Sequence, residues 1–125
     1  LAGAAFAVAG SGLHLKLAHV LGGLGLPLAR THAIVLPHVL AFNAPGAPDA
    51  TRRIARALEV DDAVAGLRAV TEAAGIPRGL YGLLREDQLD EVAARTEKVV
   101  PADNPVPVHG GAMRRLVQAV WEGSA

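Results

Sequence analysis

Four of the five histidines, His14, His19, His32 and His38, lie in the first 48 residues, together with Lys16. Imidazole is the side chain best suited to exchange protons near neutral pH, and it is also the commonest metal ligand in proteins. The same 48 residues contain no aspartate or glutamate, so no nearby carboxylate can orient an imidazole as a hydrolytic triad requires. The pattern therefore makes nucleophilic hydrolysis a weak interpretation.

The spacing of these histidines bears on metal binding. A helix presents two imidazoles to one ion when they are three or four residues apart. His14 and His19 are five apart, and His32 and His38 are six apart with Pro37 between them, so neither local pair is a ready chelate. Two alternatives stay open: a site assembled from all four rings across two helices, and core or cleft histidines that each satisfy a hydrogen bond.

The charge balance bears on partners. Twelve Lys and Arg residues stand against twelve Asp and Glu residues, giving a formal net charge of zero with neutral histidines. We therefore expect no nucleic-acid partner and no anionic membrane partner. The uncharged opening run stops at Lys16, short of the roughly 20 residues of a membrane-spanning helix. The absence of cysteine fits a reducing compartment, and we expect a cytoplasmic protein.

The elements that must position these side chains are expected to be helices. The 125 residues are 51% hydrophobic but only 3% aromatic, so the apolar mass is Ala, Leu and Val, which suits close helix packing. We expect an all-α multi-helix bundle that forms one domain over residues 1–125. Apolar core helices are expected within 1–43: one over 1–10, one over 13–22 after a break at Ser11 and Gly12, and one over 30–42 that Pro37 bends or divides.

The remaining residues carry all of the acidic side chains and predict amphipathic helices over 47–98. Helix start and stop signals place these helices at 48–58, from Asp61 to before Gly75, and from Asp87 to Lys98. Prolines at 101, 105 and 107 predict an extended segment over 99–108, because proline forbids a helix there. A last helix is expected over 111–122, where Leu116, Val120 and Trp121 can reach the core.

Residues 12–45 read GLHLKLAHVLGGLGLPLARTHAIVLPHVLAFNAP. This segment resembles the C-terminal helical domain of the iron-containing alcohol dehydrogenase family, and within it most of all the maleylacetate reductases. Those enzymes carry a similar GLHHK, LGG, GLPHAETH and VLPHVLAFNAP. Residues 102–108, ADNPVPV, resemble the NPRPV that precedes the last helix of the family.

The resemblance implies a reductase that transfers hydride from NAD(P)H to maleylacetate, with its site in a cleft between this domain and a preceding nucleotide-binding domain. The glycines of GGLGLP follow a helix instead of opening one, so we expect this chain alone to bind no cofactor. Metal-dependent members of the family hold a divalent ion with one Asp and three His. Leu15 and Leu28 stand where two of those histidines would be, so we expect no metal site.

The resemblance also suggests roles for individual residues. His19 and His14 correspond to positions beside the reacting groups and are the candidate catalytic residues. Lys16, His32 and His38, with Leu15 and Leu28, are the candidate substrate-binding residues. For each polar residue the alternative is structural: a buried imidazole bonded to a backbone carbonyl, or a partly exposed lysine on an apolar helix.

Two function classes follow. In the first, the chain is the substrate-side helical domain of a maleylacetate-reductase-like oxidoreductase, inactive alone and completed by a separate nucleotide-binding chain. In the second, it is a metal-free helical scaffold that binds a small apolar ligand, self-associates as a homodimer or supports non-redox chemistry, because leucines replace polar residues on the pocket floor. A degenerate fragment without activity is the third alternative.

Overall fold

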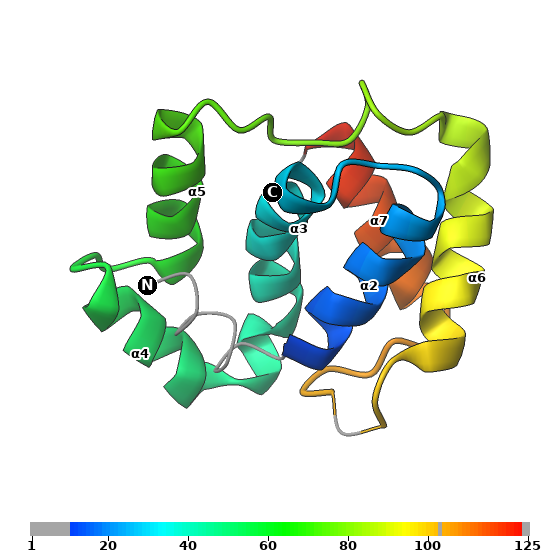
Figure 1. The fold of residues 1–125 in the computed structure, drawn as a ribbon. Helices are drawn as coiled ribbons and strands as arrows, with labels where there is room; N and C mark the ends of the chain where they lie inside the picture. Colours follow the sequence, from blue (N-terminus) through cyan, green and yellow to red (C-terminus); the bar gives the residue numbers. More distant parts are fainter. Residues whose placement is uncertain (1–10, 103, 124–125) are drawn as a thin grey trace.

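The computed structural model describes residues 11–102 and 104–123, and within these ranges the regular elements are all helical. Figure 1 shows α2, α3, α6 and α7 gathered together, with α4 and α5 beyond α3 on one side. The expected all-α fold is therefore confirmed for the described residues, whereas the helix expected over 1–10 lies outside them. The α-helices are α2 (Ser11–Gly23), α3 (Leu28–Asn43), α4 (Pro48–Ala57), α5 (Ala63–Ala73), α6 (Leu89–Val99) and α7 (Ala112–Glu122), with short 3-10 turns η1 (Ala44–Gly46) and η2 (Glu86–Gln88).

Helix α2 buries one apolar stripe. Leu13, Leu17 and Leu21 recur every four residues and are almost completely inaccessible to solvent. Gly12 lies inside this helix and not at the expected break, and a Cβ built on it would lie 2.6 Å from Cγ of Pro101. That glycine therefore permits close approach of the proline-rich segment instead of ending a helix.

Helix α3 runs through Pro37 as one element and is not divided there. Its buried residues include both Pro37 and His38, so packing against neighbouring helices holds the turn that proline weakens. Gly25, with φ of +93°, supplies the left-handed backbone of the short connection from α2.

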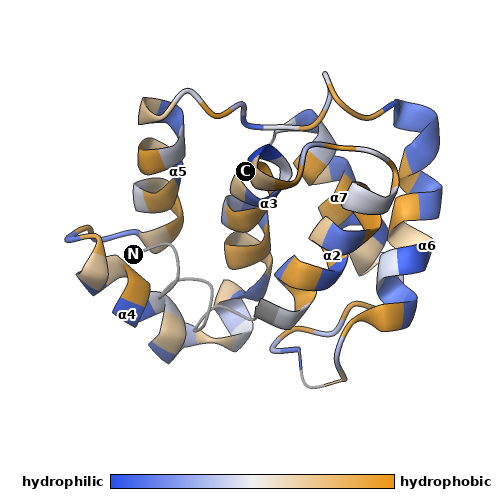
Figure 2. Cartoon of the chain, viewed as in Figure 1, coloured by the Kyte–Doolittle hydropathy of each residue, from blue (hydrophilic) through white to orange (hydrophobic). Residues whose placement is uncertain are grey.

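Two apolar clusters hold the helices together. The larger joins α2 and α3 to α6, α7 and residues 80–84, and the smaller joins Leu40 of α3 to α4 and α5 through Ile54, Ala55, Ala63 and Leu67. Figure 2 shows hydrophobic and hydrophilic stretches alternating along α6, as an amphipathic helix at the edge of a core requires. Leu116 and Val120 of α7 are buried as expected, with Trp121 half-buried beside them.

Residues 76–85 form an irregular segment that packs against α7. The backbone N–H of Leu80 donates to the Val120 carbonyl at 3.0 Å, and the Trp121 indole donates to the Leu84 carbonyl at 2.7 Å. A Cβ on Gly79 would lie 2.6 Å from backbone atoms at the end of α7. Backbone contact at this point therefore requires glycine.

The end of α3 is tied to the proline-rich segment by a pair of amides. Asn43 Nδ2 donates to Asn104 Oδ1 at 3.3 Å, and Asn104 Nδ2 donates back to Asn43 Oδ1 at 2.9 Å. Asn104 Nδ2 also donates to the Val106 carbonyl at 2.7 Å. The FNAP and NPVPV stretches thus meet in space, and their asparagines have a structural role.

Candidate functional site

Three of the predicted site residues, Leu15, Lys16 and His19, lie on α2, and a fourth, Leu28, lies near the end of that helix. We call these four residues the α2 surface. Leu15 and His19 are four residues apart and share a helix face, as do Lys16 and His19, three residues apart. Leu28, the first residue of α3, lies close to the end of α2, because its Cδ1 is 3.7 Å from a Cβ built on Gly22.

The α2 surface is open to solvent. His19 is exposed, Leu15 and Lys16 are half-buried, and Leu28 is 56% exposed, the second most exposed large hydrophobic residue among those described. The helix that carries an exposed imidazole and an amine thus ends close to an exposed leucine, which gives this part of the molecule both apolar and basic groups. Such a surface suits contact with a molecule that carries both an apolar part and a negative charge.

Two further predicted residues, His14 and His32, contact each other behind this surface. The Nε2–H of His14 donates to the backbone carbonyl of His32 at 3.1 Å. The two rings meet edge to face, with centroids 4.9 Å apart and an interplanar angle of 63°. His14 is only 2% exposed, whereas His32 is half-buried, so His14 supports His32 from the core.

The surroundings of both rings favour the neutral imidazole. Burial lowers the pKa of His14 below its usual value of 6.5; the hydrogen bond to His32 opposes this effect, and the His32 ring adds to it. Burial also lowers the pKa of His32, and the charge of His19 lowers it further. His32 therefore lies near both His14 and His19, and links the buried ring to the exposed one.

The described residues do not fit a metal ion. Among residues 11–102 and 104–123, no group of three or more His, Cys, Asp or Glu side chains is placed to hold one. Leu15 and Leu28 belong to the α2 surface and have no donor atom. Iron and zinc need several nitrogen, oxygen or sulfur donors, and His19 is the only imidazole among the four residues of this surface, so these residues do not form a full ligand set for either ion.

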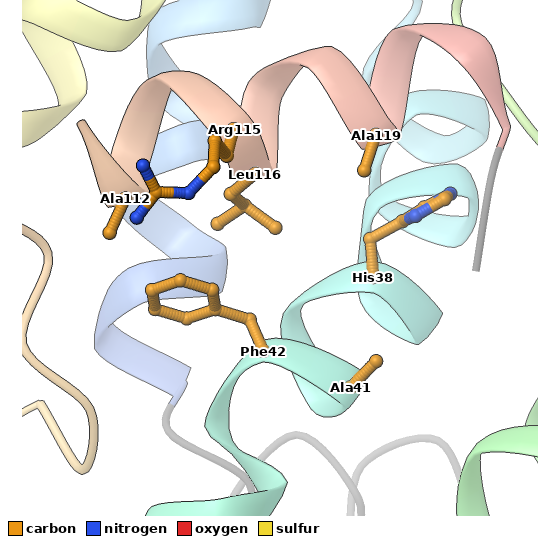
Figure 3. Close-up of a pocket in the computed structure, with 7 residues that line it drawn as sticks. All are labelled: His38, Ala41, Phe42, Ala112, Arg115, Leu116 and Ala119. Atoms are coloured by element: carbon orange, nitrogen blue, oxygen red, sulfur yellow. The ribbon is translucent and has the colours of Figure 1, made fainter.

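His38 lies farther along α3 and faces α7. Its Nε2–H donates to the Arg78 carbonyl at 2.8 Å, and its ring is 4% exposed. It also lines a cavity of about 260 Å³ between α3 and α7, where Figure 3 shows it at the opposite end from Phe42 and Arg115. The role of His38 as a substrate-binding residue stays a prediction, and its position is separate from the four residues of the α2 surface.

Sequence patterns did not predict two arginines that the structure places beside cavities. Arg115 of α7 lines the α3–α7 cavity although it is exposed. Arg68 was not singled out, yet it is 8% exposed and lies next to α3. Its only sequence signal is its spacing from Val64 and Thr71, which puts it on the half-buried face of α5.

Within the described part of the chain, no helix combines the length and the apolar character needed to cross a bilayer.

Comparison with known proteins identifies the family. The model of the Fe-containing alcohol dehydrogenase family, C-terminal, matches residues 1–121. The chain is 40% identical over 124 residues to maleylacetate reductase from Burkholderia cepacia, covering 98% of this chain and 35% of that protein. It is 41% identical over 127 residues to maleylacetate reductase 1 from Rhodococcus opacus, covering 99% and 35%.

Solved structures agree with the sequence matches. An iron-containing alcohol dehydrogenase from Corynebacterium glutamicum superposes with a TM-score of 0.86 at 42% identity, covering 91% of this chain and 33% of that one. Maleylacetate reductase from Agrobacterium tumefaciens superposes with a TM-score of 0.80 at 38% identity, covering 90% and 32%. The chain thus spans about a third of the length of its relatives. It belongs to the Fe-containing alcohol dehydrogenase family and corresponds to the C-terminal helical domain of that family.

Proposed function

We propose that this chain is the substrate-side domain of a maleylacetate-reductase-like, NAD(P)H-dependent oxidoreductase and acts with a separate nucleotide-binding domain. The observation that carries the proposal is the α2 surface, where an exposed imidazole, a lysine and an uncovered leucine lie together. Relatives three times as long, which are named maleylacetate reductases, support a second domain opposite this surface.

Each residue has a proposed role that follows from its surroundings. Lys16 binds a carboxylate of the substrate, because its ammonium is a point charge on a flexible stem at the edge of the surface. His19 is exposed, and it delivers the proton that the substrate must take up after it has received the hydride. Leu15 and Leu28 contact the apolar part of the substrate and exclude water from it.

His14 and His32 then have a positioning role, because they hold other residues of the site in place. The bond from buried His14 to the backbone of His32 fixes the start of α3 against α2, and thereby the distance between Leu28 and His19. The hydride comes from NAD(P)H bound by the second domain, since residues 11–102 and 104–123 contain no strand to open a dinucleotide-binding turn.

The test reconstitutes the two domains. The 125-residue chain is mixed with the nucleotide-binding part of the Burkholderia cepacia enzyme, and NADH absorbance is followed with maleylacetate. We expect oxidation of NADH only in the mixture and a fall in kcat of roughly 10²- to 10⁴-fold for His19→Asn. The matched control is His109→Asn, an exposed histidine outside the α2 surface, which should leave the rate unchanged. Absence of both a complex in native mass spectrometry and turnover would end this proposal.

The apolar character of the same surface favours a second candidate, a metal-free scaffold that self-associates. Leu28 would be covered by a second copy of the chain instead of by another domain. Native mass spectrometry separates the two: a homodimer that Leu28→Lys dissociates favours the scaffold, and a monomer that pairs with the nucleotide-binding domain favours the reductase.

A further inference from the structure

The cavity between α3 and α7 has room for a small organic molecule. Its volume is about 260 Å³, and none of the four residues of the α2 surface lines it. One water molecule needs roughly 10–15 Å³ of cavity volume on the same scale, so the space exceeds that of a single water many times over. Three small side chains, Ala41 on α3 and Ala112 and Ala119 on α7, leave this space between the helices. A ligand about the size of benzoate therefore fits.

The walls of the cavity are mainly apolar. Phe42 of α3 and Leu116 of α7 both line it, and Figure 3 shows the Leu116 side chain pointing from α7 toward α3. His38 lies at the end away from Phe42, and its Nε2–H donates to the Arg78 carbonyl at 2.8 Å. An apolar group placed along these walls loses contact with water, which favours binding.

The other end of the cavity carries an arginine whose charge is not balanced. Figure 3 shows the Arg115 guanidinium at the end near Ala112. Arg115 is exposed, and its guanidinium makes no hydrogen bond or ion pair with another residue in the described part of the chain. The neighbouring Arg114, in contrast, donates to Asp90 and to Gln118, each at 2.7 Å. The donors of Arg115 are thus available to a ligand.

The electrostatics of the cavity favour one negative charge. No acidic side chain is among the described residues that line it. Ala112 is the first residue of α7, so the positive end of that helix dipole adds to the charge of Arg115. A guanidinium binds a carboxylate through two parallel N–H groups. One arginine balances one carboxylate, whereas a phosphate or a dicarboxylate would bring a second charge onto apolar walls.

We propose that the α3–α7 cavity binds a small monocarboxylate with an apolar body. The carboxylate lies on Arg115 and the body lies between Phe42 and Leu116. An exposed arginine pairs only weakly with a carboxylate, so the apolar body supplies much of the affinity. For a ligand the size of benzoate, we expect a Kd on the order of 0.1–1 mM. Binding here does not require reductase activity, because the cavity is separate from the α2 surface.

The test measures binding of benzoate to the 125-residue chain by heteronuclear NMR and by calorimetry. Backbone amide signals of Ala41, Phe42 and Ala119 should shift and then saturate. Two further probes each lack one half of the ligand: benzyl alcohol has no charge, and acetate has no ring. Benzyl alcohol should bind roughly three- to tenfold more weakly than benzoate, and acetate should cause no saturable shift.

Variants assign the two halves of the ligand to the two parts of the cavity. Arg115→Gln should weaken benzoate roughly three- to tenfold and leave binding of benzyl alcohol unchanged, a difference that a general disturbance of the fold does not produce. The matched control is Arg114→Gln, which changes an arginine that already bonds to Asp90 and should keep the affinity for benzoate. Ala119→Leu fills the cavity and should abolish binding of both ring compounds.

The outcomes separate this site from others. Saturable shifts on α3 and α7, weakened for benzoate alone by Arg115→Gln, support the proposal. No saturable shift at about 10 mM benzoate, or shifts that gather around Lys16 on the α2 surface, would overturn it. Equal affinities for benzoate and benzyl alcohol, or full benzoate affinity in Arg115→Gln, would overturn it as well.

Discussion

Acid sensitivity of the contact between His14 and His32 is the most direct check on the geometry behind the α2 surface. The experiment lowers the pH from about 7.5 to about 5.5 and compares the unsubstituted chain with the His14→Phe variant. His14 is 2% exposed, and burial lowers its pKa below 6.5 in the folded chain. Unfolding returns the ring to water and to its ordinary pKa.

The sign follows from proton linkage. Below about pH 6.5 the unfolded chain binds a proton at residue 14 that the folded chain does not, so the free energy of unfolding falls as pH falls. The slope for one such histidine is at most about 1.4 kcal/mol per pH unit, and it ends at the lowered pKa of the folded chain. His32 acts in the same direction but contributes less, because it is half-exposed and solvent screens its surroundings.

Urea denaturation across this pH range measures the effect. His14→Phe keeps a ring but loses the donor to the His32 carbonyl, so we expect a loss of about 1 kcal/mol near pH 7.5. Its pH slope should be markedly shallower than that of the unsubstituted chain. The exposed His109→Gln serves as control and should keep the original slope. Equal slopes for all three proteins would refute a buried, neutral His14.

Three further predictions concern the fold. The double-mutant cycle of Asn43→Ala and Asn104→Ala should give a coupling energy of about 1–2 kcal/mol in urea denaturation, and additivity would refute the reciprocal amide bonds. Asp62→Ala should cost about 1 kcal/mol in thermal unfolding, because its carboxylate accepts two N–H groups at the start of α5, whereas an unchanged midpoint would exclude this cap. Gly79→Ala should cost roughly 1–3 kcal/mol through contact with the end of α7, and Gly82→Ala, which has open space around it, should be close to neutral.

Helix positions in the second half were predictable because local signals determine them. Pro48 opens α4 as expected, and α5 begins close to the expected Asp61, with Asp62 as its cap. These signals act over a few residues and so can be seen in a sequence. Gly12 was misinterpreted as a break because its reason, the approach of Pro101, lies far away along the chain. Residues 76–85 were left without a predicted element for the same reason, since Leu80 and Leu84 are buried by α7.

The roles of the candidate site residues stay predictions, and their arrangement could not be derived from the sequence. Resemblance to the family selected the four residues of the α2 surface, and helical spacing explains why Leu15 and His19 share a face. The burial of His14 and its bond to His32 depend on how α2 crosses α3, which no local pattern encodes.

The small size of the cluster that joins α4 and α5 to α3 has a consequence for local unfolding of the molecule. Among the described residues, five buried side chains form the cluster that holds these two helices, whereas seventeen form the cluster beneath α2, α6 and α7. Backbone amides of α4 and α5 should therefore exchange with deuterium through a partial opening that leaves the rest of the molecule folded. The fold therefore opens at this junction while the part that carries the α2 surface stays folded.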